Sequence, residues 1–132
     1  MRRFDPYLPS IKNMPNSAVE RWFLSLKNIW INKDIENIGS LLSSEFRYYE
    51  DPFGPLLVTL DEVKNAWKGV SDQDILKLEI CTLIEHENEG CATYEFSYKD
   101  VQGNTHDSKG AYFVMLDGRG RAIEFRQWWV SR

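Results

Sequence analysis

One carboxylate in the sequence stands where it could act as a general base. Asp51 follows a strand-like segment, Glu45 to Glu50, and precedes Pro52, which restricts Asp51 to an extended backbone. We therefore expect its side chain to be held where the strand meets the mouth of a pocket. A carboxylate against apolar walls resists ionisation and can become an effective proton acceptor. The alternative is that residues 51–54, Asp-Pro-Phe-Gly, form only a turn in which Asp51 bonds its own backbone.

A second group of polar side chains falls on one face of a predicted sheet. This inward face is otherwise apolar, and its polar members are Thr82, His86, Tyr94, Tyr98, Tyr112 and Gln127. Small-molecule sites have this composition, and so do ordinary cores whose tyrosines find partners. His86 and His106 each fall near the end of a hairpin, where a lone solvated histidine is expected.

Three helices are predicted before the sheet. Ser17 followed by Glu20 is a capping box, and Asp34 can cap a second, shorter helix. Thr59 or Asp61 can cap a third, which should end near Gly69. The first helix carries one apolar stripe, made of Val19, Trp22, Phe23, Leu26, Ile29 and Trp30.

From Gln73 onward the spacing of apolar residues changes to period two. Three turns, at 88–90, 102–104 and 118–121, divide this region into four strands. The predicted inward face of the first strand is Leu76, Leu78, Ile80, Thr82 and Ile84.

The three turns also predict the register of the hairpins. Closing the loops at 87/91, 101/105 and 118/121 pairs Tyr94 with Ile84 and Tyr112, Val114 with Phe125, and Leu116 with Ile123. Gly110 then lies between Phe96 and Trp129, where a missing side chain leaves room for two rings. Because apolar residues face one side on all three hairpins, the sequence predicts a four-stranded antiparallel meander. The predicted fold is one α+β domain over 16–132 with an apolar pocket between helices and sheet, preceded by an irregular arm over 1–15.

The net charge, the apolar stretches and the cysteine spacing exclude some classes of partner and location. A net charge of −4 without a basic stripe argues against nucleic acid. The prolines and Asp5 after Met1-Arg2-Arg3 argue against a signal peptide, and no apolar stretch is long enough for a membrane span, so we expect a cytoplasmic protein. Cys81 and Cys91 fall about 16 Å apart on the predicted hairpin, too far for a disulfide. We expect free thiols, no metal and no cofactor.

The run Glu50-Asp51-Pro52-Phe53-Gly54, with a helix ending near Trp67 after it, resembles the ketosteroid isomerases. More broadly, the chain resembles the SnoaL-like (polyketide cyclase) branch of the nuclear transport factor 2-like superfamily. Comparable features flank the run in that family, here Asp34-x-x-x-Ile38-x-x-Leu41, Gly120-Arg121-Ala122-Ile123 and Trp128-Trp129. The resemblance spans roughly residues 17–130 and implies a cone-shaped α+β barrel with an interior pocket and dimers packed through the sheet.

The resemblance also implies roles for single residues. Asp51 matches the aspartate that shuttles a proton beside a ketone, and Tyr112 falls at the position of one oxyanion donor. The other donor position falls at Leu26, which cannot donate, with Trp22 and Trp30 as the nearest donors. The predicted site has Asp51 and Tyr112 as catalytic residues and a ligand-binding wall of Trp22, Leu26, Tyr48, Trp67, Tyr94, Phe96, Phe125, Gln127 and Trp129.

Two functions remain open at this point. The first is an isomerase, cyclase or dehydratase that uses Asp51 as base on a hydrophobic carbonyl compound. The second is a non-catalytic ligand-binding or dimerisation module. An apolar patch on the opposite face of the sheet favours a homodimer, although the arm over 1–15 could cover it instead. The patch is made of Ala111, Phe113, Met115, Trp128 and Val130.

Overall fold

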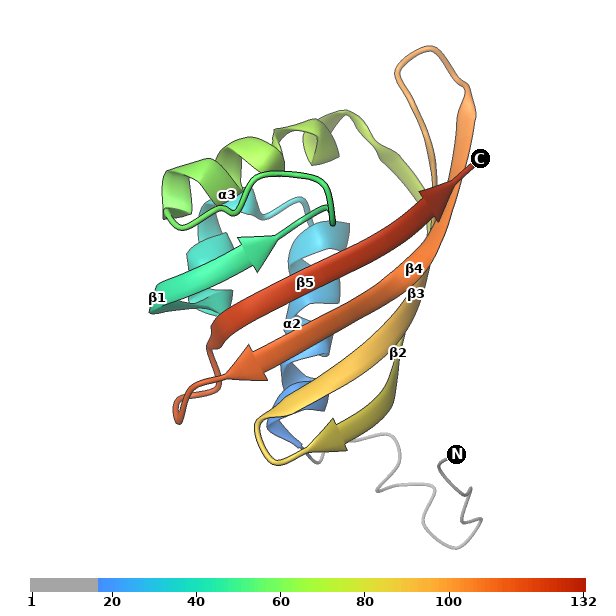
Figure 1. The fold of residues 1–132 in the computed structure, drawn as a ribbon. Coiled ribbons are helices and arrows are strands. Elements are labelled where there is room, and N and C mark those ends of the chain that lie inside the picture. The colour runs from blue at the N-terminus through green and yellow to red at the C-terminus, as the bar shows by residue number, and fades with distance from the viewer. Residues whose placement is uncertain (1–16) are drawn as a thin grey trace, which may run out of the picture.

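The computed structural model describes residues 17–132, so the predicted arm over 1–15 lies outside the described residues. The described part contains two α-helices, two 3₁₀ helices and five strands, with α2 lying against one face of the sheet (Figure 1). In chain order the elements are α2 (Ala18–Ile31), η1 (Ile35–Leu41), β1 (Leu42–Tyr49), α3 (Leu60–Ala66), η2 (Lys68–Asp72), β2 (Asp74–His86), β3 (Glu89–Lys99), β4 (Thr105–Leu116) and β5 (Ala122–Ser131).

Helix α2 begins and packs as predicted. The Ser17 hydroxyl accepts a hydrogen bond from the Glu20 amide at 3.0 Å and so satisfies one free N–H of the first turn. All six residues of the predicted apolar stripe are buried. The stripe therefore fixes which side of α2 faces the sheet.

The other two predicted helices differ in detail. The second is a 3₁₀ helix, η1, and the Asp34 side chain accepts from the Asn37 amide group instead of capping the backbone. The third, α3, is capped by Thr59, which forms a reciprocal capping box with Glu62. It ends at Ala66 and continues as η2, so Gly69 does not terminate it.

The five strands form one mixed sheet in the order β1-β5-β4-β3-β2. Strands β2 to β5 are the predicted antiparallel meander, while β1 pairs in parallel with β5. Because β1 and β2 are both edges, the sheet is open and does not close into the predicted cone-shaped barrel.

The register is right for the third hairpin and shifted in the first two. Val114 pairs with Phe125 as predicted, but a bulge pairs Leu116 with Ala122 instead of Ile123. Tyr94 pairs with Ile80 and Gly110, since the first loop closes at residues 86 and 89 and the second at 99 and 105. At Tyr94 the shift is four residues in the first hairpin, including the bulge between Thr82 and Ile84, and two residues in the second. Both shifts are even there, so each side chain of β3 and β4 keeps its predicted face.

Two local features explain the errors in the first hairpin. Glu87 adopts a positive φ of 56°, which permits a two-residue loop where a three-residue loop ending in glycine was expected. Two bulges in β2 turn Leu76 and Ile84 outward, leaving them 51% and 67% exposed, so their predicted inward placement is wrong.

Gly110 makes room for aromatic rings as expected, but one of its two predicted neighbours is wrong. It pairs with Tyr94 and Trp129, and not with Phe96. A Cβ atom at this position would overlap the Trp128 carbonyl oxygen and lie 2.8 Å from the Tyr94 ring. Cys81 and Cys91 are free, as predicted, and pair with Thr93 and Ile84 across the ladder.

Candidate functional site

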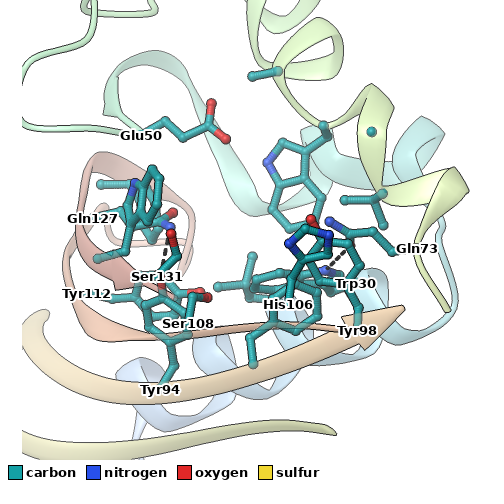
Figure 2. Close-up of a pocket in the computed structure, with 18 of the residues that line it drawn as sticks. Trp30, Glu50, Gln73, Tyr94, Tyr98, His106, Ser108, Tyr112, Gln127 and Ser131 are labelled. Atoms are coloured by element: carbon teal, nitrogen blue, oxygen red, sulfur yellow. Dashed lines mark hydrogen bonds between the residues drawn. The ribbon is translucent and has the colours of Figure 1, made fainter. Parts of the chain in front are cut away.

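A partly open cavity of about 330 Å³ lies between the sheet, α2 and the α3–η2 segment (Figure 2). This volume is in the range of small-molecule sites. Its wall is largely aromatic, with contributions from both helices and from strands β1, β3, β4 and β5. The aromatic members are Trp30, Tyr48, Trp67, Tyr94, Phe96, Tyr98, Tyr112, Phe125 and Trp129.

Most of the side chains predicted for the pocket lie on this wall. Those that line the cavity are Leu26, Tyr48, Trp67, Tyr94, Phe96, Tyr112, Phe125, Gln127 and Trp129. Trp22 does not line it, because its indole N–H donates to the Leu41 carbonyl at 2.8 Å and its ring packs on Phe125. Trp22 is therefore part of the core.

Asp51 lies beside the cavity and not on its wall. Its Oδ1 accepts a hydrogen bond from the Phe53 amide at 2.7 Å, and its carbonyl accepts from the Gly54 amide at 3.0 Å. The residue faces a neighbouring depression lined also by Leu57 and Glu62. This is the turn geometry of the alternative interpretation, and the catalytic role of Asp51 stays a prediction.

Two carboxylates line the cavity, and one of them, Asp107, accepts a hydrogen bond from the Ser97 hydroxyl at 2.6 Å. The other is Glu50, which was not predicted as a site residue. Its side chain is partly buried and borders both the cavity and the depression next to Asp51. Among residues 17–132 it has no hydrogen-bond or ion-pair partner. Burial raises the pKa of Glu50, and the nearby Asp51 charge raises it further. The missed signal was alternation, because Glu50 stands two residues after the buried Tyr48.

Three tyrosine hydroxyls face the same cavity. The Tyr48 hydroxyl accepts from the Trp67 indole at 2.8 Å, and the Tyr94 hydroxyl accepts from the Gln127 amide at 3.1 Å. Each keeps its own proton to donate. The Tyr112 ring stacks on Tyr94 at 4.4 Å, and its hydroxyl has no hydrogen-bond partner in the described chain.

Burial keeps these hydroxyls protonated. It raises the pKa of Tyr112 well above its usual value, with smaller contributions from Tyr94, Tyr48 and Glu50. The pKa values of Tyr48 and Tyr94 are also raised, again mainly by burial. The cavity therefore offers neutral O–H donors and the unpaired carboxylate of Glu50, which suits binding and polarising a carbonyl oxygen.

The far end of the cavity contains His106, which was predicted to be a lone solvated histidine. The His106 Nε2 lies 2.8 Å from Asp100 Oδ2, and its ring stacks on Tyr98 at 4.9 Å. It lines the cavity and is not a lone solvated group. His86, in contrast, is 82% exposed, as expected. The Trp30 indole, a suggested donor, bonds Gln73 Oε1 at 3.3 Å.

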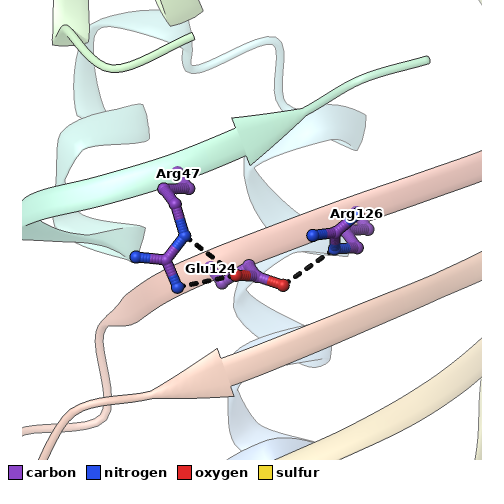
Figure 3. A network of polar contacts seen from close by, with 3 residues as sticks. All are labelled: Arg47, Glu124 and Arg126. Carbon is purple, nitrogen blue, oxygen red and sulfur yellow. Dashed lines mark hydrogen bonds and ion pairs between the residues drawn. The ribbon is translucent and has the colours of Figure 1, made fainter. Parts of the chain in front are cut away.

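The opposite face of the sheet carries a different carboxylate. Glu124 is 9% exposed and accepts hydrogen bonds from Arg47 at 2.7 and 2.9 Å and from Arg126 at 2.8 Å (Figure 3). Arg126 also stacks over the Tyr49 ring at 4.1 Å. Burial by itself would raise the pKa of Glu124, but the two guanidinium groups outweigh it and lower the pKa.

The predicted dimer patch surrounds this network. Ala111, Phe113 and Met115 are partly buried on that face, and Trp128 and Val130 are 44% and 76% exposed. The homodimer stays a prediction. In the described range no group of His, Cys, Asp and Glu could hold a metal ion, and no helix there could span a membrane.

Comparison with known proteins shows structural likeness only. No protein-family model and no curated protein matches the sequence. A Mycobacterium tuberculosis protein crystallised with estradiol-17β-hemisuccinate superposes with a TM-score of 0.73 at 13% identity, covering 85% of this chain and 93% of that one.

Two further solved structures have the same architecture. An NTF2-like protein of unknown function from Burkholderia pseudomallei has a TM-score of 0.66 at 17% identity, covering 84% of this chain and 89% of its own. The epoxide hydrolase/cyclase-like enzyme SalBIII, of pyran ring formation in salinomycin, has a TM-score of 0.70 at 9% identity over 86% and 88%. Strand order, helix placement and cavity together show that this chain has the nuclear transport factor 2-like fold, as its resemblance to SnoaL-like proteins implied.

Proposed function

We propose that the chain binds a small, mainly apolar carbonyl compound in the cavity and catalyses proton transfer next to the carbonyl group. The reaction would be an isomerisation, cyclisation or dehydration. The observation that carries the proposal is that a carboxylate and the Tyr112 hydroxyl border one aromatic cavity. The steroid ester bound by one structural neighbour and the ring-forming chemistry of another are consistent with it.

The proposed chemistry needs two groups. A carboxylate at the end of β1 removes a proton from the carbon beside the carbonyl, and the electron pair moves to the carbonyl oxygen. Tyr112 donates a hydrogen bond to that oxygen, since its raised pKa keeps the phenol protonated. The protonated carboxyl then returns the proton to carbon. The sequence assigns the base to Asp51. A positioned base contributes about 10²–10⁴ in rate, and one oxyanion donor about 10²–10³.

A non-catalytic binding module is the second candidate. The hydrogen bond from the Phe53 amide to Asp51 favours it, because this bond gives Asp51 a structural role in the turn. In that case the cavity would bind the same class of ligand without converting it. Dimerisation through the patch around Trp128 and Val130 is compatible with either function.

Two measurements on the full chain separate these functions. Binding of 2-naphthol, followed by its fluorescence, tests the cavity, and Ala66→Phe, which narrows the cavity, should weaken it. Deuterium uptake at the α-carbons of 2-tetralone in D₂O, followed by proton NMR, tests proton transfer. We expect binding and accelerated uptake. Binding without uptake would support the binding module, and absence of both would refute the proposed function.

A further inference from the structure

The two adjacent carboxylates at the end of β1 differ in where the strand points them. In the parallel pairing with β5, Tyr48 lies opposite Phe125, and both are buried on the cavity side. Arg47 and Tyr49 alternate with Tyr48 and belong to the opposite face, beside Glu124 and Arg126. Strand β1 ends at Tyr49, so Glu50 is the first residue after it. Continued alternation places Glu50 on the cavity side, where it lines the wall, whereas the turn closed by the Gly54 amide begins at Asp51.

We infer that Glu50, and not Asp51, is the carboxylate that removes and returns the proton. The inference rests on the proposed function and assigns its base. It requires Glu50 to face the bound ligand while Asp51 stays in the turn. The cavity wall includes Glu50 and excludes Asp51, which fits that requirement.

The bonding of the two side chains supports this assignment. Asp51 has one oxygen engaged by the Phe53 amide, whereas Glu50 has no hydrogen-bond or ion-pair partner among the described residues. Taking a carboxylate partly out of water without pairing it costs folding free energy. Such a side chain is therefore better explained by a ligand contact than by a structural role.

The position of Glu50 also suits the chemistry. Figure 2 shows Glu50 entering the cavity from the side opposite Tyr94 and Tyr112. A carbonyl oxygen bonded to Tyr112 would leave the adjacent carbon on the side of Glu50. The titratable groups around Glu50 are Asp51, Tyr48, Tyr112 and, across the depression, Glu62, which is bonded to the Val58 and Thr59 amides.

These neighbours give Asp51 a secondary role. Its charge raises the pKa of Glu50 beyond the effect of burial. A base with a raised pKa is better matched to reactions near neutral pH than an ordinary carboxylate. Asp51 would then be a positioning residue, because it orders the turn and adjusts the basicity of its neighbour.

Matched variants test the assignment. We compare Glu50→Gln and Asp51→Asn, with Glu45→Gln as a control on an exposed part of the same strand. For 2-tetralone, we expect Glu50→Gln to lose about 10²–10⁴ of the rate of deuterium uptake. Asp51→Asn should keep most of the maximal rate and shift the pH midpoint down, because removing the Asp51 charge lowers the pKa of Glu50. A large loss in Asp51→Asn together with a nearly normal Glu50→Gln would overturn the inference and leave the proposed function standing.

A chemical label adds a readout that does not depend on turnover. The apolar α-bromo ketone 2-bromo-2′-acetonaphthone esterifies a carboxylate: the carboxylate oxygen bonds the α-carbon, and the carbon–bromine bond breaks to release bromide. We expect the ester at Glu50, where peptide fragmentation would locate it. Excess 2-naphthol should lower the yield of this ester by competing for the cavity. If wild type takes up no deuterium, the proposed function fails, and the ester alone then decides which carboxylate faces the ligand. An ester at Asp51, or at neither residue, overturns the inference in either case.

Discussion

Glu50 directly follows β1, Glu124 lies on the neighbouring strand β5, and the two side chains face opposite sides of the sheet. Glu124 is nearly buried and bound by two arginines, so its pKa is lowered. Glu50 is partly buried in a cavity, has no partner in the described chain, and has a raised pKa. This contrast separates two kinds of carboxylate. A paired, acidic one contributes to the structure, while an unpaired, basic one in a cavity is available for chemistry.

The largest expected difference is in catalysis. Glu50→Gln should reduce deuterium uptake by 2-tetralone about 10²–10⁴-fold, because the proton acceptor is removed. Glu124→Gln should leave the rate near that of wild type, since Glu124 lies on the face opposite the cavity. Proton NMR under identical conditions gives both rates. Equal losses in the two variants would show that the cavity face has no special role.

The next expected effect concerns the hydroxyl facing Glu50. Tyr112→Phe keeps the ring packed on Tyr94 and removes the donor to the carbonyl oxygen. We expect about a 10²–10³-fold loss in uptake with little change in stability. The control is Tyr98→Phe, whose ring also lines the cavity but stacks on His106 at the far end. If Tyr98→Phe lost as much rate as Tyr112→Phe, the proposed position of the carbonyl oxygen at the Tyr112 end of the cavity would be wrong.

The two carboxylates should also differ in their contribution to stability. Glu124→Gln removes a charge that accepts three hydrogen bonds from guanidinium groups. We expect a loss of about 1–2 kcal/mol in the free energy of unfolding, at the low end for charged hydrogen bonds because both arginines are substantially exposed. Glu50→Gln should leave that free energy unchanged or slightly higher, as it removes an unpaired charge. Urea unfolding at pH 7 measures both values, and a less stable Glu50→Gln would indicate a hidden structural partner.

The smallest expected effect is the pH dependence of those stabilities. The folded-state pKa of Glu50 is raised, so its contribution to stability is present below the unfolded pKa and is lost as pH rises through the folded pKa. The folded-state pKa of Glu124 is lowered, so its contribution is present above the unfolded pKa and is lost as pH falls through the folded pKa. Urea unfolding at pH 4 and pH 7 should therefore give opposite trends for the two variants relative to wild type. If the stability differences of both variants from wild type changed in the same direction between pH 4 and pH 7, the opposite pKa shifts of Glu50 and Glu124 would be contradicted.

The sequence predicted those parts of the fold that depend on local patterns. The stripe on α2, the capping of α2 and α3, and the alternation along β3 to β5 all follow from residue spacing. The stripe and the alternation account for seven of the nine predicted side chains on the cavity wall, while Tyr48 lies on β1 and Trp67 directly after α3. The register errors left the side chains of β3 and β4 on their predicted faces, because the shifts at Tyr94 are even, but the bulges in β2 turned Leu76 and Ile84 outward.

The parts that could not be predicted depend on contacts distant in sequence. The Arg47–Glu124–Arg126 network requires the parallel pairing of β1 with β5. No hairpin turn connects these two strands, so local sequence does not predict their pairing. The choice between Glu50 and Asp51 depends on where β1 ends and on the Phe53 amide that bonds Asp51. The motif contains both candidate residues, and the end of β1 together with the Phe53 amide bond is the basis for our choice between them.

A crystal structure of the protein with 2-naphthol bound is the sharpest test of Glu50 as the base that faces the ligand. Its ring skeleton and hydroxyl mimic the enol of 2-tetralone. We expect the ring in the cavity, its oxygen within hydrogen-bond distance of the Tyr112 hydroxyl, and its C1 atom about 3–3.5 Å from the Glu50 carboxylate. A ring bound in the depression against Asp51, or a cavity left without ligand, would contradict the account.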